Sequence, residues 1–326
     1  MQNKKIWAVL MHLSYSQWWP KKEYNIFNNK YWDEFLMKCN ETSTNMIVLD
    51  VGDGVEYKSH PEICVKDAWS RERVHSELEK CRKLGIELIP KLNFSTSHCH
   101  WMGEYRKMTS SKPYYAFCRD IIKEVYEIFE APRFIHIGMD EEEFINTRAS
   151  DHVVFRKGDL LIHDIKFLVD EVNKTGATPW IWHDPLTEYM DRFTDMIGPD
   201  EVIISPWWYW GYTRDKLFPI ITDYEGLYAN RGIKYEHDVP CRANFLKNIL
   251  LLMEKGYRYI PTPSTFYKVD GNTEETVEFF KNGSPSEDQI LGFMTAPWKK
   301  TLPENKADLD ESLELLKEAR EKFYKE

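Results

Sequence analysis

Four consecutive acidic side chains, at residues 140–143, follow an apolar segment directly. Adjacent carboxylates repel one another, and this repulsion can raise the pKa of one of them into the range that a general acid needs. Acids at the start of a helix also complement the helix dipole, and this structural explanation is favoured for Glu142 and Glu143. The chemistry of proton transfer is therefore assigned to Asp140 and Glu141.

Polar and aromatic side chains also stand where other apolar segments end. They are Asp50, Asp53, Asn93, His183, Asp184, Trp207, Trp208 and Trp298. The opposite ends of these segments carry unremarkable residues such as Lys5, Asn45 and Thr178. In a barrel of parallel strands the carboxyl ends meet at one face, where active sites are built. The asymmetry predicts a site at that face.

The elements that would position these residues are short apolar runs alternating with amphipathic helical patterns. Strands are expected at residues 6–15, 45–54, 86–94, 133–140, 178–185, 201–210, 257–264 and 289–298. Runs that are almost continuously apolar are typical of parallel strands buried on both faces. Eight such runs with intervening helices predict an α/β fold, a (β/α)₈ TIM barrel forming a single domain over residues 1–326. The polar segment 211–245 is expected to be a long active-site loop.

Composition narrows the class of protein further. The chain has 326 residues, is 42% hydrophobic and carries a net charge of -10 without a basic block, so neither a nucleic-acid nor a membrane partner is expected. Its six cysteines form no C-x-x-C pair. The N-terminal 19 residues lack a small-residue cleavage site and are interpreted as a strand, not a signal peptide. The sequence does not decide the cellular compartment. The chain as written suggests the cytoplasm, and a removed signal peptide would indicate a secreted or periplasmic protein.

The hexapeptide His136-Ile137-Gly138-Met139-Asp140-Glu141 resembles the H-x-G-G-D-E motif of family 20 glycoside hydrolases, the β-N-acetylhexosaminidases, with Met139 at the second glycine. The resemblance implies a retaining, substrate-assisted mechanism in which the 2-acetamido oxygen of the sugar attacks the anomeric carbon. Glu141 would be the general acid/base and Asp140 would orient the acetamido group. It implies a terminal β-linked N-acetylhexosaminide as substrate, and no cofactor or metal.

Other segments match the family in order. The stretch "STFYKVD" implies that Tyr267 binds the acetamido oxygen and that Asp270 binds a hydroxyl, and the final strand implies that Trp298 walls the acetamido pocket. The remaining candidates for substrate binding are Trp182, Trp207, Asp184, His136 and His98. Aromatic walls suit this substrate because an N-acetyl methyl and a sugar ring both pack on aromatic faces.

The chain also departs from the family. The arginine of strand one has no counterpart, Lys299 and Lys300 replace a glutamate, and the P-E-x-D element reads P-K-L-N at residues 90–93. The small α/β domain that usually precedes the family's barrel is not expected here.

Two alternatives remain open. One is a metal-dependent barrel hydrolase using His98, His100 and His136, completed by Asp140, His183 or Asp184. The other is a non-catalytic carbohydrate-binding barrel. The identity of the hexosamine, the aglycone and the oligomeric state stay open.

Overall fold

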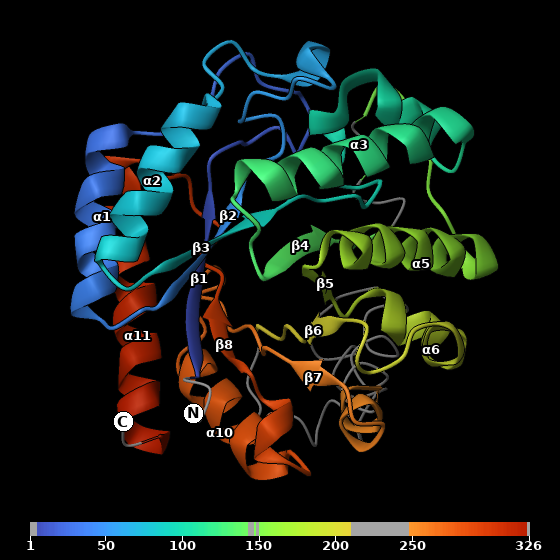
Figure 1. Cartoon of the computed structure of the whole chain (residues 1–326). Coiled ribbons are helices and arrows are strands. Elements are labelled where there is room, and N and C mark those ends of the chain that lie inside the picture. The colour runs from blue at the N-terminus through green and yellow to red at the C-terminus, as the bar shows by residue number, and fades with distance from the viewer. Residues whose placement is uncertain (1–4, 143–146, 148–149, 210–247, 325–326) are drawn as a thin grey trace, which may run out of the picture.

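Eight parallel strands form one sheet in the computed structural model, which describes residues 5–142, 147, 150–209 and 248–324 (Figure 1). The strands are β1 (Ile6–His12), β2 (Met46–Asp50), β3 (Glu87–Lys91), β4 (Phe134–Gly138), β5 (Thr178–Trp182), β6 (Ile203–Ser205), β7 (Arg258–Tyr259) and β8 (Gly292–Thr295). Neighbours in the sheet are neighbours in the sequence, and β1 pairs with both β2 and β8.

The sheet closes between its two outer strands. A parallel bridge joins Tyr259 to Ile290, and the backbone N–H of Leu291 donates to the Tyr259 carbonyl at 3.0 Å. The N–H of Met294 donates to the Pro261 carbonyl at 3.1 Å, which continues the contact beyond β7. The predicted (β/α)₈ barrel is therefore confirmed.

Alternate side chains of each strand face the barrel interior and the surrounding helices. In β1, Ala8 and Leu10 pack inside the barrel against residues such as Trp180, whereas Trp7 and Val9 pack outward. All seven residues of β1 are buried. Burial on both faces explains why the strand segments read as continuous apolar runs and lack the alternation of a half-exposed sheet.

The helices surround the strands on the outside (Figure 1). They include α1 (Asn29–Glu41), α2 (Arg71–Lys83), α3 (Lys112–Ile128), α5 (Gly158–Thr175), α6 (Pro185–Met196), α10 (Asn272–Gly283) and α11 (Lys306–Phe323). The 3₁₀ segments are η1 (Pro61–Ile63), η2 (His100–Met108), η3 (Glu287–Gln289) and η4 (Pro303–Asn305). α2 ends at Lys83, and Gly85 adopts φ 71° two residues later, a left-handed conformation that often ends helices.

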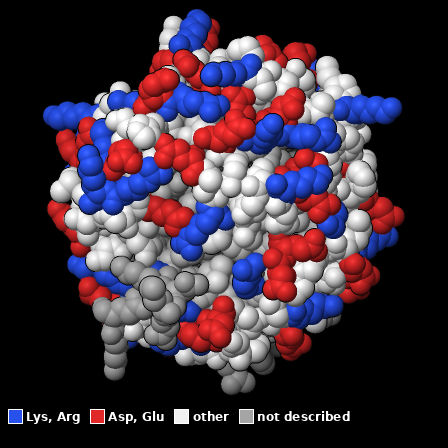
Figure 2. Space-filling view, in the orientation of Figure 1, with Lys and Arg blue, Asp and Glu red and all other residues white. Residues whose placement is uncertain are grey.

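Several strands are shorter than the sequence predicts. The segment 257–264 contributes only the two residues of β7, and its remainder continues as buried connection at the carboxyl end of the barrel. The predicted loop 211–245 lies outside the described residues. Within those residues, no helix combines the length and apolarity needed to cross a bilayer. Figure 2 shows acidic and basic side chains interspersed over one face.

Candidate active site

The backbone after β4 makes an unusual turn that places the acidic residues. Gly138, Met139 and Glu141 all have positive φ, at 71°, 72° and 51°. Gly138 is required there because an added Cβ would lie 2.1 Å from the side-chain oxygen of Asn93. This close approach lets the Asn93 amide reach the residues that follow the strand.

Met139 occupies the left-handed region although it is not glycine, and its side chain is fully buried. Removing a buried methionine side chain costs about 2–5 kcal/mol, whereas left-handed backbone costs a non-glycine residue roughly 1–2 kcal/mol. The packing of Met139 therefore outweighs its backbone strain.

This balance gives a test by substitution. Both Met139→Ala and Met139→Gly should lower the free energy of unfolding, by about 2–5 kcal/mol for alanine. The glycine variant should be the more stable of the two by about 1 kcal/mol, the reverse of the usual order, because only glycine relieves the strain at φ 72°. Urea unfolding measures both, and a less stable glycine variant would contradict the strained backbone.

Asn93 at the end of β3 connects the turn to Asp140. Its Nδ2 donates to Asp140 Oδ1 at 2.7 Å, and its Oδ1 accepts from the backbone N–H groups of Met139 at 3.2 Å and Ser95 at 3.1 Å. Asp140 is only 7% exposed, and a buried carboxylate needs such donors. An aspartate at position 93 would instead set two carboxylates against each other.

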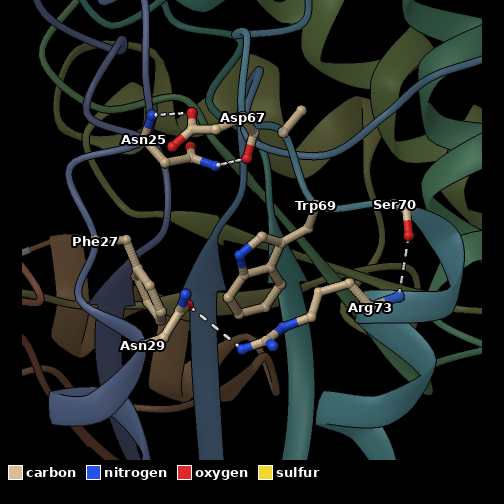
Figure 3. A pocket seen from close by; sticks show the side chains of 8 residues that line it. Asn25, Phe27, Asn29, Asp67, Trp69, Ser70 and Arg73 are labelled. Atoms are coloured by element: carbon tan, nitrogen blue, oxygen red, sulfur yellow. Dashed lines mark hydrogen bonds between the residues drawn. The ribbon is translucent and has the colours of Figure 1, made fainter.

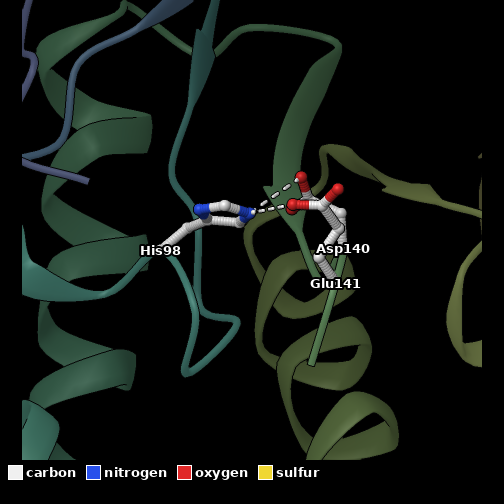
Figure 4. A group of neighbouring side chains, drawn as sticks. All are labelled: His98, Asp140 and Glu141. Atoms are coloured by element: carbon white, nitrogen blue, oxygen red, sulfur yellow. Dashed lines mark hydrogen bonds and ion pairs between the residues drawn. The ribbon is translucent and has the colours of Figure 1, made fainter. Parts of the chain in front are cut away.

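His98 points its ring toward both candidate catalytic acids, which lie side by side (Figure 4). Its Nε2 is 3.4 Å from Asp140 Oδ2 and 3.2 Å from Glu141 Oε2. Burial alone would lower the pKa of His98, but the two carboxylates together outweigh burial and raise it. The Glu141 side chain is 42% exposed, so of the two acids it is the one that faces solvent.

Asp184, just after β5, holds the turn from the other side. Its Oδ1 accepts from the Glu141 N–H at 3.1 Å, and its Oδ2 accepts from Trp207 Nε1 at 2.7 Å. Burial and the charges of Asp140 and Glu141 raise the pKa of the Asp184 carboxyl well above its ordinary value. The predicted site residues of β3, β4, β5 and β6 are therefore brought together around three carboxyl groups.

Glu142 is engaged by a different partner. Both of its carboxylate oxygens receive donors from the buried Arg156 guanidinium, at 2.6 Å from Nε and 2.8 Å from Nη2, and Oε2 also accepts from the Thr96 N–H at 3.2 Å. Arg156 further contacts Asp164 and the Phe94 carbonyl. This network ties the residues after β3 to those after β4, so Glu142 has a structural partner and is not free for chemistry.

Breaking this buried pair should cost much stability. We expect Glu142→Gln to lower the free energy of unfolding by about 3 kcal/mol or more, because it leaves the Arg156 charge buried and partly uncompensated. A matched control is Glu104→Gln, which removes the exposed pair with Lys107 at 2.9 Å and should cost less than about 1 kcal/mol. Thermal and urea unfolding measure both, and equal losses would show that the buried network contributes no more than a surface pair.

The model of the glycosyl hydrolase family 20 catalytic domain matches residues 86–307, which include the acid pair, its histidine and both flanking strands. The chain belongs to glycosyl hydrolase family 20. The resemblance predicted from the hexapeptide is thereby confirmed.

Solved structures agree with the fold at low identity. The exo-β-N-acetylglucosaminidase of Vibrio harveyi, solved with N-acetylglucosamine, is 12% identical with a TM-score of 0.63, over 96% of this chain and 54% of that one. A Streptomyces plicatus β-hexosaminidase, solved with its product, is 12% identical with a TM-score of 0.62, over 99% and 69%. Dispersin B is 15% identical with a TM-score of 0.58, over 97% and 98%. The chain thus spans about half of the Vibrio chain, and no curated protein matches it by sequence.

Aromatic side chains gather at the same end of the barrel as the acids. The Trp182 and Trp298 rings lie 5.9 Å apart, those of Trp207 and Tyr209 lie 5.0 Å apart, and Trp298 Nε1 donates to the Tyr209 hydroxyl at 2.8 Å. Burial, followed by the charge of Asp140, raises the pKa of Tyr209 well above its ordinary value. Sequence reasoning missed Tyr209, because it stands in the run "WWYW", where spacing does not distinguish the inward side chain.

His136 lies beneath this aromatic group. Its Nδ1 accepts from the Gly138 N–H at 3.0 Å, and its ring centroid is 4.7 Å from that of Trp182. Burial lowers the pKa of His136 well below its ordinary value, so the imidazole is neutral. A neutral ring in this position supports Gly138 and Trp182 from below.

The two candidates from the "STFYKVD" segment lie farther out. Tyr267 is 54% exposed, and its ring centroid is 6.3 Å from that of Tyr209. Asp270 is exposed just before α10, and no contact joins it to the acid pair in the described part of the chain. The structure therefore brings Tyr267 to the rim of the aromatic group but does not bring Asp270 to the acids.

The ends of β2, β3 and β8 differ from the family pattern. Lys91 stands at the glutamate of the P-E-x-D element and forms a fully buried ion pair with Asp50. Lys299 pairs with Asp308 at 2.8 Å, while Lys300 Nζ lies 5.5 Å from the centre of the Tyr15 ring. The sequence shows that the family's acids are replaced here, but it does not predict which residues the replacing lysines contact.

The histidines proposed for a metal-dependent hydrolase are not assembled. His100 Nδ1 lies 3.2 Å from the Gln17 carbonyl and its Nε2 lies 2.9 Å from Ser150 Oγ, and His136 is committed to Gly138. Among the described residues, the donor atoms that do come within 4.8 Å of one another belong to His98, Asp140 and Glu141. That set coincides with the acid pair and its hydrogen-bonding histidine.

Proposed function

We propose that the chain is a retaining glycosidase that removes terminal β-linked N-acetylhexosamine by substrate-assisted catalysis. The observation that carries this proposal is the pairing of a buried Asp140 with a solvent-facing Glu141, joined by His98 within 3.4 Å of both. Membership of glycosyl hydrolase family 20 supports the reaction class.

The geometry suits two successive steps. In the first, Glu141 donates its proton to the glycosidic oxygen while the acetamido oxygen forms a bond to the anomeric carbon, and the bond to the leaving group breaks. Asp140 accepts from the acetamido N–H and so balances the positive charge of the cyclic intermediate. In the second step, Glu141 takes a proton from water while the water oxygen bonds to the anomeric carbon. The bond from that carbon to the acetamido oxygen breaks, and the product has the original configuration.

The environment of Asp184 argues against an enzyme nucleophile. Both of its oxygens already accept hydrogen bonds, from Glu141 and Trp207. Its raised pKa favours the protonated carboxyl, which is a poor nucleophile. We assign Asp184 to positioning of Glu141 and Trp207, which leaves the substrate as the source of the nucleophile.

The aromatic side chains fit an N-acetyl group and a sugar ring. We propose that Trp182, Trp207 and Trp298 wall the acetamido pocket, with His136 below them. Tyr267 remains a candidate donor to the acetamido oxygen at the rim, and Asp270 a candidate for a hydroxyl. Because β1 and β2 precede the matched residues and complete the barrel, we also propose one catalytic domain over residues 1–326.

An activity screen tests the proposal. Purified protein should hydrolyse nitrophenyl N-acetyl-β-glucosaminide or the corresponding galactosaminide, with retention of configuration seen by NMR of the first product. Treatment with a chelator should leave the rate unchanged, since no step uses a metal ion. Binding of either sugar without hydrolysis would instead identify a non-catalytic carbohydrate-binding barrel, and loss of activity with the chelator would identify the metal-dependent alternative.

A further inference from the structure

A second pocket lies apart from the acid pair, between the connections that follow β1 and β2. It has a volume of about 350 Å³, within the range of small-molecule sites. Figure 3 shows that its side chains come from the approach to α1 and from the start of α2. Both connections follow carboxyl ends of strands, so this pocket opens at the same end of the barrel as the active site.

The walls offer hydrogen-bonding groups of both kinds. Asp67 accepts from the Asn25 N–H through Oδ1 at 2.7 Å, and its Oδ2 has no partner among the described residues. Asn29 Oδ1 accepts from Arg73 at 3.4 Å, and Asn29 Nδ2 donates no hydrogen bond to the described residues. A ligand here meets a carboxylate acceptor and an amide donor. A hydroxyl group suits both, because it can donate to the carboxylate and accept from the amide.

The charge of Arg73 is compensated inside the protein, because Arg73 is paired with the buried Glu77 at 2.7 Å. The exposed Asp67 carboxylate is therefore the charge that a ligand meets on the pocket wall, and it repels an anion. A neutral ligand with hydroxyl groups avoids this repulsion and can donate a hydrogen bond to the carboxylate.

The remaining wall is aromatic. The rings of Phe27 and Trp69 meet edge to face, with centroids 5.1 Å apart at 87°, and Arg73 covers part of Trp69 at 5.4 Å. Trp69 is only 7% exposed, whereas Phe27 is partly buried, so Phe27 supplies the apolar surface that a ligand can reach. Apolar ring surface beside paired donors and acceptors matches the two kinds of surface on a pyranose.

We propose that this pocket is a secondary carbohydrate-binding site that takes one neutral sugar unit of a longer glycan. The binding itself stands on the pocket alone. Its benefit for catalysis rests on the proposed function, since a glycan bound here is retained at the end of the barrel that carries Glu141.

The test blocks the pocket without touching the acid pair. Asn29 is exposed in the first turn of α1 and lines the pocket, whereas its exposed neighbour Lys30 does not line it. Binding of a β-1,4-linked N-acetylglucosamine trimer, and of a glucose trimer, is measured by calorimetry for Asn29→Trp and Lys30→Trp. Each is made in the Glu141→Gln protein so that the sugar is not consumed.

The stoichiometry separates the two proposals. We expect two sites per chain for the N-acetylglucosamine trimer in the parent and in Lys30→Trp, and one site in Asn29→Trp. If the acid pair does not bind the sugar, the parent and Lys30→Trp should each bind one trimer, and Asn29→Trp should bind none. Asp67→Asn, which keeps the acceptor for Asn25, should weaken the second site about tenfold. Equal stoichiometry in all proteins, or no binding of the glucose trimer to the parent protein, would overturn the secondary site.

Discussion

Glu141→Gln is expected to lower kcat on a nitrophenyl N-acetyl-β-hexosaminide by about 10²–10⁴-fold, the range for loss of one general acid. Glu141 faces solvent beside His98, where it can reach the oxygen of a leaving group. The effect should depend on that leaving group, since a good leaving group needs little protonation. We therefore expect the largest loss with an alkyl glycoside and the smallest with a dinitrophenyl glycoside, measured as kcat for each.

The neighbouring acid provides the control for this substitution. Glu143→Gln should change kcat little, since acids at a helix start contribute only about 0.3–1 kcal/mol to stability; Glu143 itself lies outside the described residues. Equal loss in the two variants, or a loss in Glu141→Gln that does not vary with the leaving group, would show that the general acid has been assigned to the wrong residue.

The barrel could be predicted from sequence because its strands are buried on both faces. Such burial leaves a direct record in segments like 45–54 and 86–94, which contain β2 and β3. The exact ends of the strands are harder to predict from the sequence. β7 keeps only two residues of its apolar segment, because the residues that follow are buried as connection, and burial alone does not distinguish a strand from a covered loop.

The site could be predicted in part. Asp140, Glu141 and His98 stand in one motif or at adjacent strand ends, and the structure places them in contact. The partner of Glu142 could not be found, because Arg156 lies 14 residues away in a segment without a recognisable pattern. The amide role of Asn93 was also hidden, since it depends on the close approach to Gly138 and not on spacing.

The substrate's acetamido group provides the other large expected effect. A β-glucoside, which carries a hydroxyl at carbon 2, has no internal nucleophile and should be cleaved more than about 10³-fold more slowly in kcat/KM than the N-acetyl substrate. Well-placed intramolecular nucleophiles reach effective molarities of about 10⁵–10⁸ M, so this loss is large even if the glucoside still binds. Steady-state kinetics with matched nitrophenyl glycosides measure it directly.

A stable mimic of the cyclic intermediate completes this test. A thiazoline derived from N-acetylglucosamine should inhibit competitively and bind more tightly than the product, because it resembles the species that the pocket stabilises. Rapid cleavage of the plain glucoside would instead require an enzyme nucleophile. Asp184 is the remaining carboxyl beside Glu141, yet both of its oxygens accept hydrogen bonds and its pKa is raised. That result would therefore require the turn after β4 to rearrange on binding, and Asp184→Asn would then abolish the glucosidase activity.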